Sequence, residues 1–400
     1  MKSYSETLSI IKEEFSRLKL KTREVDIIDS FGRILAEDIV ADIDLPPFNN
    51  SAVDGYAVQY NDRRSWKLIG EISAGNFTNL KVSNDQTVLI TTGAKLPVGT
   101  DTVIPLEDVT VAGNTIVLNG GVSVKKGANV RHQGEDLRKS EIATKIYTKI
   151  DSKVMSTLAA CGKKVVKIFE PLKIGILATG DELIPIEKKP ENDKLRVTNT
   201  YSLYGAVREA GQSPILFGFV KYDKELVRQR LQEIFDSNLD ILITTGGVSV
   251  GKYDFLKMLF EEEGVVTKCW KANVKPGKPI YFGVYVSQTR RIMVVGLPGN
   301  PVSSLVGFKV FIRPAIDYIF HQPLVPIIDA VLQSPYKKND NKRHFARGFL
   351  YKEEEIWKVK TQYSQSSGNM VEMSMSNCLI VFKEEMLNPK EGERVECILI

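Results

Sequence analysis

Apolar residues recur at two different spacings along the first part of the chain. At residues 3–20 the spacing is helical, which predicts an amphipathic helix, and Ser3 and Glu6 are spaced to form a capping box at its start. From about 66 to 150, short runs of Val, Ile and Thr alternate with Gly, Asn and Asp, which predicts β structure with many turns. Short helices are expected at 31–36 and 151–168.

From residue 172 the pattern changes to short, continuously apolar runs separated by amphipathic stretches. Strands are expected at 172–180, 214–220, 240–247, 265–270, 279–286 and 291–299, and helices at 199–210, 223–236, 254–263 and from 301 onward. Strands that alternate with helices in this way predict a doubly wound parallel sheet with helices on both faces. After residue 323 short β segments return, so the fold class is multidomain α/β plus β.

Composition and charge exclude several classes of protein. A net charge of +5 over 400 residues is too small for a nucleic-acid footprint. No segment reaches the roughly 18 apolar residues of a membrane span. The 4 cysteines form no CxxC pair and are expected to be buried thiols, and 3 histidines are too few for a His-rich metal site. We expect a cytoplasmic protein with no nucleic-acid and no membrane partner.

Three polar, glycine-bearing loops follow three of the expected strands. Parallel strands bind ligands at their carboxyl ends, so the loops should meet on one edge and offer backbone N–H groups to phosphate. Ordinary turn chemistry explains any single loop equally well, but not three together. The candidate binding residues are Thr179 and Gly180, then Gly246, Gly247, Ser249 and Gly251, then Pro298, Gly299 and Asn300, with Asn300 also expected to cap the helix from 301.

A rigid loop at 275–279 lies between two expected strands. It holds Lys275 and Lys278 among two prolines and a glycine. Fixed ammonium groups suit phosphate or an oxyanion such as molybdate, whereas solvated surface lysines are the plain alternative. The neighbouring glycine loops favour the oxyanion interpretation.

Carboxylates share this neighbourhood. Glu182 follows the first strand, Asp223 opens an expected helix, and Asp254 follows the second glycine loop. Carboxylates beside an anionic substrate indicate a bridging hard cation, Mg²⁺, with Asp254 and Glu182 as the expected ligands. Helix capping is the alternative role for Asp223 and Asp254.

The segment LPPFNNSAVDGYAV (45–58) is too long and too apolar for a plain hairpin connector. Two prolines stiffen its start, and Asp-Gly marks a tight turn. We expect a pre-organised site loop in which Asp54 is the residue that does chemistry. The turn at 91–94 could add the hydroxyl and backbone N–H of Thr92, although an ordinary β-turn fits as well.

Over essentially its whole length the chain resembles the molybdopterin molybdenumtransferases, the bacterial molybdenum-insertion enzymes, and the matching C-terminal part of gephyrin. The shared motifs occur in one order: PPFNNSAVDGYAV, TTGA, ATGDEL, TTGGVSVGKYD, VKPGKP and GLPGNPVS. The resemblance implies a homodimer of four-domain chains. The domains would be an elongated helical domain (1–45 with 140–169), a β-rich domain (46–139), an α/β molybdopterin-binding domain (170–322) and a C-terminal β domain (323–400).

The resemblance also implies roles for individual residues. It assigns catalysis to Asp54, Glu182, Lys275 and Lys278, and substrate contacts to Thr92, Asp223, Arg347 and Ser367. Three positions depart from the family pattern: Asn49 replaces the usual Asp, Val53 replaces the usual Met, and the segment 363–368 matches poorly. Asn49 keeps a capping side chain but loses a charge.

The implied reaction joins two anionic substrates, adenylylated molybdopterin and molybdate. The phosphates would bind along the glycine loops, Mg²⁺ would bridge them, the two lysines would position molybdate, and AMP would leave, with Asp54 as the candidate that activates the attacking oxygen. The 46–57 loop would reach the site of the other subunit. Transient contacts with other cofactor-biosynthesis enzymes are expected.

Two rival functions stay open at this stage. A molybdopterin adenylyltransferase shares the α/β domain, but it has no need of flanking regions of about 170 and 80 residues. A non-catalytic scaffold like gephyrin would carry a second α/β copy and a long linker, and the chain has neither.

Overall fold

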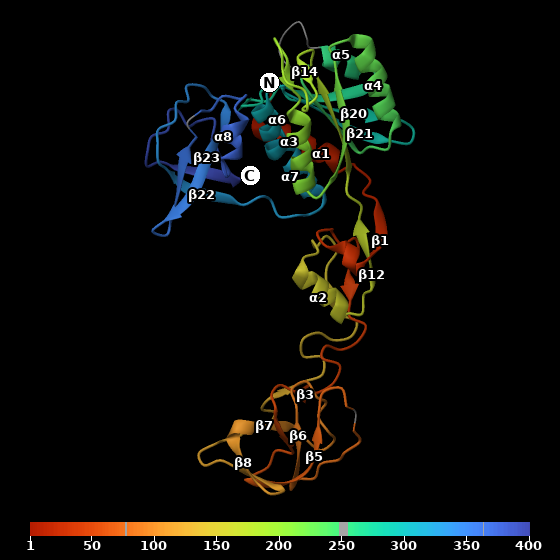
Figure 1. The fold of residues 1–400 in the computed structure, drawn as a ribbon, viewed down its shortest axis with the longest axis vertical. Coiled ribbons are helices and arrows are strands. Elements are labelled where there is room, and N and C mark those ends of the chain that lie inside the picture. The colour runs from red at the N-terminus through yellow and green to blue at the C-terminus, as the bar shows by residue number, and fades with distance from the viewer. Residues whose placement is uncertain (77, 248–254, 363) are drawn as a thin grey trace. The chain divides into compact units, whose positions relative to one another are not determined.

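The computed structural model describes residues 1–76, 78–247, 255–362 and 364–400. It divides into two compact units (Figure 1). The larger unit combines Met1–Arg23 with Phe169–Ile400, and the smaller unit is Glu24–Ile168. The chain crosses between them within strands β1 (Thr22–Asp26) and β12 (Val165–Phe169). No helix in the described ranges is long and apolar enough to cross a membrane.

A six-stranded sheet with the order β16-β13-β17-β21-β20-β18 forms the centre of the larger unit. Neighbours among the first four strands are parallel, and β20 runs antiparallel to both β21 and β18. The predicted α/β sheet is confirmed, with one strand reversed. The strands are β13 (Lys173–Thr179), β16 (Ser213–Val220), β17 (Ile241–Thr245), β18 (Val265–Trp270), β20 (Tyr281–Val286) and β21 (Arg291–Leu297).

Helices cover both faces of this sheet (Figure 1). On one face, α4 (Lys224–Asp236) and α5 (Phe255–Glu262) bury Leu231 and Leu259 against Leu242 and Val294 of the strands. The other face carries α3 (Asn199–Glu209) and α6 (Pro301–Gly307), which contact each other. A π-helical turn (Phe308–Ile312) joins α6 to α7 (Arg313–Ile319).

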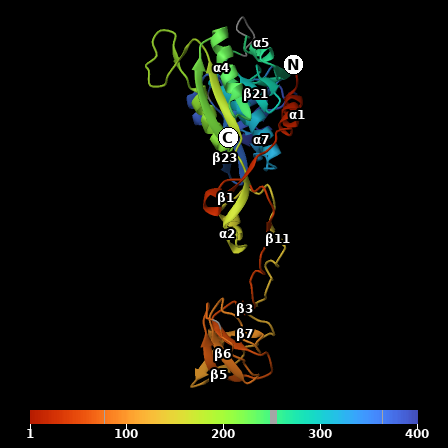
Figure 2. The ribbon, with the colours of Figure 1, turned by 90° about the vertical axis from the view of Figure 1, so that its right-hand side faces the viewer.

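The N-terminal helix α1 (Tyr4–Phe15) packs against α7 (Figure 2). Its predicted capping box is confirmed, because Ser3 Oγ accepts a hydrogen bond from the Glu6 N–H while the Glu6 carboxylate accepts one from the Ser3 N–H. The helix ends at Phe15, five residues before the predicted end at residue 20.

The C-terminal part of the larger unit is a second sheet, and it draws in the lysine loop. The pairing of β25 with β23 closes the ring β23-β24-β22-β26-β25, and the short β19 adds alongside β23. The elements are β19 (Val274–Lys275), β22 (Ile327–Leu332), β23 (Arg343–Glu353), β24 (Ile356–Thr361), α8 (Met370–Ser374), β25 (Cys378–Phe382) and β26 (Arg394–Leu399). A small ladder of β14 (Leu183–Ile184) and β15 (Leu195–Arg196) lies outside both sheets.

The smaller unit is built on a sheet with the order β7-β4-β6-β5-β9-β8. These strands are β4 (Gly55–Val58), β5 (Ser65–Ile72), β6 (Gln86–Ile90), β7 (Thr102–Pro105), β8 (Val109–Ala112) and β9 (Thr115–Leu118). The remaining elements are 3₁₀ turns at Ile27–Ser30 and Leu106–Asp108, the strands β2 (Ile39–Val40), β3 (Asn50–Ser51), β10 (Val130–Arg131) and β11 (Ile142–Thr144), and helix α2 (Ser152–Ala160).

Two predicted helices of this unit are corrected by the structure. The helix expected at 31–36 is absent: a single 3₁₀ turn precedes it, and Gly32 at φ +75° turns the chain out of helical geometry. The helix expected over 151–168 ends at Ala160, just before Gly162 at φ +69°. Residues 165–169 then form β12, whose alternation of exposed and buried positions has the period of a strand.

Candidate functional site

The three glycine loops meet on one edge of the central sheet, as predicted. Strands β13, β17 and β21 are adjacent and parallel, so the residues that follow them project from the same side. The N–H of Gly246 donates to the carbonyl of Leu297 over 3.1 Å, which joins the second loop to the third. Gly246 has φ +87°, and a Cβ there would lie 2.3 Å from the carbonyl oxygen of Thr179. Only glycine fits at this point.

These loops enclose a cavity of about 810 Å³, which we call the glycine-loop cavity. Its lining includes seven of the residues predicted from sequence: Thr179, Glu182, Gly246, Gly247, Pro298, Gly299 and Asn300. Lys194 and Arg196, on the segment that ends in β15, add two cationic side chains to the same wall. A pocket with backbone donors and cations suits a phosphate-bearing ligand of substantial size.

Two predicted binding residues, Gly180 and Asp223, do not line this cavity but stabilise the elements around it. The N–H of Gly180 donates to the Val220 carbonyl over 3.0 Å, which ties β13 to β16. Asp223 caps α4, because its Oδ1 accepts from the Leu226 N–H over 2.8 Å. The capping role that the sequence left open for Asp223 is therefore the one observed. Ser249, Gly251 and Asp254 lie outside the described residues.

Tyr222 and Asn199 also line the glycine-loop cavity, and sequence reasoning missed both, as it missed Lys194 and Arg196. The hydroxyl oxygen of Tyr222 accepts a hydrogen bond from the Gly247 N–H over 3.0 Å, and burial raises the pKa of this phenol. The Asn199 amide donates to the Gly299 carbonyl over 2.8 Å. With the amide so oriented, Asn199 Oδ1 is buried and has no partner within the described part of the chain. An asparagine at the start of a predicted helix was the available signal.

Glu182 is the described carboxylate that lines the glycine-loop cavity. Its neighbour Asp181 is engaged elsewhere, since Asp181 Oδ1 accepts from the Tyr222 N–H over 3.0 Å. No group of three or more potential metal ligands among His, Cys, Asp and Glu occurs in the ranges that the structure describes. A single carboxylate nevertheless suits Mg²⁺, which keeps several waters and binds one or two carboxylates together with substrate phosphates.

A second cavity of about 310 Å³, the lysine-loop cavity, adjoins the first. Pro279 lines both cavities, and Lys275 and Lys278 line only the second. Both lysines are exposed, and neither forms an ion pair with any described residue. The wall is completed by Val274, Pro276, Gly277, Ser303, Tyr336, Lys342, Phe345, Gln365 and Ser367. Two unpaired cations in a small hollow suit a compact oxyanion.

Arg347 and Ser367 are brought together, but in different roles. Ser367 lines the lysine-loop cavity. Arg347 is 1% exposed, and its guanidinium donates to the carbonyls of Ser364, Ser366 and Asn369 at 2.6, 2.9 and 2.6 Å. In this structure Arg347 holds the loop that presents Ser367.

Asn300 links the two cavities, and its predicted capping role is wrong. Asn300 occupies the position before α6, but its side chain makes no capping hydrogen bond. Its amide donates instead to Ser367 Oγ over 2.9 Å. The side chain thereby ties the third glycine loop to the loop that Arg347 holds.

In the smaller unit, Asp54 and Thr92 form one cluster. Asp54 Oδ1 accepts from the Thr92 N–H over 2.6 Å and from its hydroxyl over 2.8 Å. These hydrogen bonds, the backbone one first, hold the pKa of Asp54 below its ordinary value. Asn49, where an acid was expected from the family pattern, accepts from the Gln133 N–H over 2.8 Å and so serves a turn.

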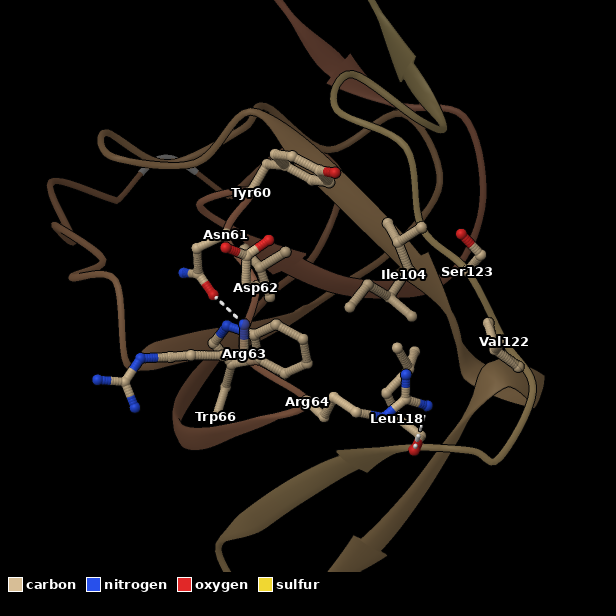
Figure 3. Close-up of a pocket in the computed structure, with 12 residues that line it drawn as sticks. Tyr60, Asn61, Asp62, Arg63, Arg64, Trp66, Ile104, Leu118, Val122 and Ser123 are labelled. Atoms are coloured by element: carbon tan, nitrogen blue, oxygen red, sulfur yellow. Dashed lines mark hydrogen bonds between the residues drawn. The ribbon is translucent and has the colours of Figure 1, made fainter.

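A further hollow of about 240 Å³ lies in the smaller unit and is lined from β5, β7 and β9 (Figure 3). Arg64 lines it, and its guanidinium donates to the Asn119 carbonyl over 2.7 Å. The indole N–H of Trp66 is buried there without a partner among the described residues. None of the site residues predicted from sequence lines this hollow.

Comparisons with known proteins agree across the chain. Residues 2–162 match the model of the MoeA N-terminal region (domain I and II), 175–318 a probable molybdopterin binding domain, and 329–400 the MoeA C-terminal region (domain IV). The chain is 33% identical to a molybdopterin molybdenumtransferase of Haemophilus influenzae, covering 94% of this chain and 93% of that one. It is 30% identical to one of Bacillus subtilis, covering 95% and 90%.

A solved structure shares the whole architecture. The crystal structure of a molybdopterin biosynthesis moeA protein from Pyrococcus horikoshii OT3 aligns with a TM-score of 0.84 at 27% identity, covering 100% of each chain.

Proposed function

This chain belongs to the molybdopterin molybdenumtransferase (MoeA) family, and from that premise we propose that it inserts molybdenum from molybdate into adenylylated molybdopterin and releases AMP. The observation that carries the proposal is the pair of adjoining cavities. One is large and rich in backbone donors, the other is small and bears two unpaired lysines, and Pro279 borders both. A large phosphate-bearing ligand and a compact oxyanion could therefore meet at a shared wall.

The nucleotide and pterin substrate belongs in the glycine-loop cavity. Support comes from the positive φ of Gly246 and Gly247, which lets the backbone approach phosphate oxygens closely. Lys194 and Arg196 add cationic charge for the same group. These residues bind and orient the substrate, so the phosphoanhydride is held beside the second cavity while bulk water is displaced.

Molybdate belongs in the lysine-loop cavity. Lys275 and Lys278 supply two ammonium groups that no described carboxylate neutralises. Fixed cations in a small hollow stabilise negative charge on an oxyanion and on the transition state that it forms. Ser367, tied to Asn300, adds a hydroxyl at the boundary between the two substrates.

Glu182 is our proposed ligand for Mg²⁺, together with Asp254, which lies outside the described residues. What supports this role is the placement of Glu182 on the glycine-loop cavity. The ion would neutralise charge on the bridging phosphates of the substrate.

The Asp54–Thr92 cluster belongs to the smaller unit, whereas every residue that lines the two cavities belongs to the larger unit. We propose a homodimer in which Asp54 of one chain completes the site of its partner. A two-fold dimer would then hold two composite sites.

Subunit exchange tests the composite site. Asp54→Asn alone and Glu182→Gln alone should each be nearly inactive, because each removes one charged group from every site. In an exchanged mixture half the dimers are mixed and each holds one intact site, so activity should recover towards about a quarter of wild type. No recovery would mean that both residues act within one chain.

Reconstitution tests the reaction itself. Wild-type protein supplied with adenylylated molybdopterin, Mg²⁺ and molybdate should release AMP and form molybdenum cofactor. A parallel reaction with molybdopterin and ATP tests the adenylyltransferase alternative. Formation of adenylylated product in that arm, with no AMP above a protein-free control in the first, would replace our proposal with the alternative.

A further inference from the structure

A chain of three hydrogen-bonded side chains stands behind the lysine-loop cavity. His344 Nε2 lies 2.8 Å from Asp340 Oδ1, and His344 Nδ1 lies 3.1 Å from the hydroxyl of Tyr336. His344 is 1% exposed. Tyr336 itself lines the lysine-loop cavity. The catalytic residues expected from sequence include none of the three.

The partners of His344 define its tautomer. Asp340 also accepts hydrogen bonds from the backbone N–H and the ammonium of Lys342, at 3.2 and 3.3 Å. Burial raises the pKa of Asp340, but the hydrogen bonds from Lys342 and His344 outweigh it and bring the pKa to about 2. An ionised Asp340 only accepts, so Nε2 carries the proton. Nδ1 is then the acceptor, and the Tyr336 hydroxyl donates to it.

The same environment keeps His344 neutral and Tyr336 protonated. Burial, together with the positive charges of Lys275 and Lys338, outweighs the effect of Asp340 and lowers the pKa of His344. Burial also raises the pKa of Tyr336 to about 12. A neutral imidazole with a free Nδ1 lone pair can take a proton from the phenol, and the Asp340 carboxylate then stabilises the imidazolium.

Tyr336 is the member of this hydrogen-bonded series that lies beside the two lysines. Its ring stacks on Phe382 with centroids 4.3 Å apart, which holds the phenol in place. His344 is the ladder partner of Lys275 where β19 pairs with β23. Tyr336, whose hydroxyl can carry a proton, thus lines the same cavity of about 310 Å³ as the two ammonium groups proposed to hold molybdate.

We propose that Tyr336 is a catalytic proton carrier for the molybdenum-transfer step, with His344 and Asp340 as its positioning residues. The inference rests on the proposed function, because it requires molybdate in the lysine-loop cavity. When the dithiol group of adenylylated molybdopterin binds molybdate, two S–H bonds and one Mo–O bond break and two Mo–S bonds form. The oxide leaves with both protons as water, and the oxidation state of molybdenum does not change.

The relay moves these protons without any external acid or base. The phenol oxygen of Tyr336 accepts a thiol proton while the phenol passes its own proton to His344 Nδ1. The reverse movement delivers the proton to the departing oxide. The three side chains are then back in their starting state, so a second cycle carries the second thiol proton to the oxygen that leaves as water.

The test uses the full-length protein and single-turnover rates of molybdenum transfer at saturating molybdate. Tyr336→Phe keeps the stacked ring but removes the hydroxyl, and His344→Gln keeps hydrogen-bonding capacity but cannot take a proton. Tyr351→Phe lies on β23, the strand that carries His344, but Tyr351 does not line the lysine-loop cavity, so this variant is the matched control. Each relay variant should be slower by about 100-fold or more, with the KM for molybdate nearly unchanged.

The pH profile separates a proton relay from a purely structural network. The wild-type rate should fall as the pH drops through the lowered pKa of His344, because the imidazolium has no free lone pair. That acid limb should vanish in His344→Gln. The other charged groups that face His344 and Tyr336 are Lys275, Lys338, Asp340 and Arg347. The pKa of Asp340 is lowered to about 2, so protonation of this carboxylate does not account for the limb.

Two results would overturn the relay, and they are distinguishable. Equal rates for Tyr336→Phe and Tyr351→Phe, with wild type active, would remove the relay and leave the proposed function standing. A wild-type protein that transfers no molybdenum would remove both. Circular dichroism checks the fold of each variant, and should Tyr336→Phe fail to fold, His344→Gln carries the same comparison.

Discussion

The two adjoining cavities are built on different physical principles. The glycine-loop cavity is shaped by backbone, with glycines at positive φ following adjacent parallel strands. The lysine-loop cavity is shaped by side chains, with two free ammonium groups and with Tyr336, which is hydrogen-bonded to the buried His344. Backbone donors make a site that depends on conformation, whereas side-chain cations make a site that depends on charge. Substitutions should therefore damage the two cavities in separable ways.

Gly246→Ala should give the largest effect, on the glycine-loop cavity. The new Cβ would lie 2.3 Å from the Thr179 carbonyl oxygen at φ +87°, so strain and a backbone clash combine. We expect a loss of about 2–5 kcal/mol in the free energy of unfolding and loss of AMP binding. Gly205→Ala on α3 is the control, since its Cβ would meet nothing within 4 Å. Chemical denaturation measures the free energy of unfolding, and calorimetric titration measures AMP binding. Equal stability of Gly246→Ala and Gly205→Ala would contradict the claim that the backbone conformation at Gly246 shapes this cavity.

Lys278→Ala should damage only the lysine-loop cavity, and by less. A charge-assisted contact is worth roughly 1.5–3 kcal/mol, so the molybdate concentration for half-maximal transfer should rise about 10- to 150-fold. AMP affinity and unfolding free energy should hardly change, because the side chain is exposed. Lys153→Ala, whose side chain is 87% exposed in the smaller unit, controls for net charge. An unaltered molybdate dependence in Lys278→Ala would refute the assignment.

Thr92→Val should give the smallest effect, a change in titration within the smaller unit. It removes one of the two hydrogen bonds that hold the pKa of Asp54 below 3.8, so that pKa should rise. Because the pKa of Asp54 is lower in the folded state than in the unfolded state, its ionised carboxylate stabilises the fold at pH values above the unfolded-state pKa. This stabilisation is lost as the pH falls through the folded-state pKa. NMR titration of the Asp54 carboxyl measures the shift, with Asp44 as an internal reference whose pKa should stay the same. An unchanged Asp54 pKa would show that the hydroxyl contributes nothing.

The convergence of the glycine loops could be predicted because parallel-sheet geometry is a general rule. Any three strands that run side by side in one direction bring their following residues to one edge, and the sequence marks both strands and loops. The helix expected at 31–36 failed because Gly32 adopts a left-handed backbone, which apolar spacing does not reveal. The predicted end of α2 was wrong for the same reason, because Gly162 also adopts a left-handed backbone conformation.

Side-chain partners across sequence-distant loops could not be predicted. Asn300 was expected to cap its own helix, but its amide reaches Ser367, 67 residues further along the chain. The pairing of β19 with β23 places Lys275 opposite His344, which contacts Tyr336, and no local pattern encodes that pairing. Arg347 is present where the family pattern implied, yet its burial beneath the Ser364–Asn369 loop is visible only in three dimensions.

The most direct test of the two-cavity account is whether AMP release depends on molybdate. Wild-type protein would be incubated with adenylylated molybdopterin and Mg²⁺, with and without molybdate, and both AMP and molybdenum-loaded cofactor would be quantified over one turnover. The account predicts AMP and cofactor in equal amounts with molybdate, and little of either without it. Release of AMP at the same rate in both reactions would contradict the claim that the two cavities work as one site.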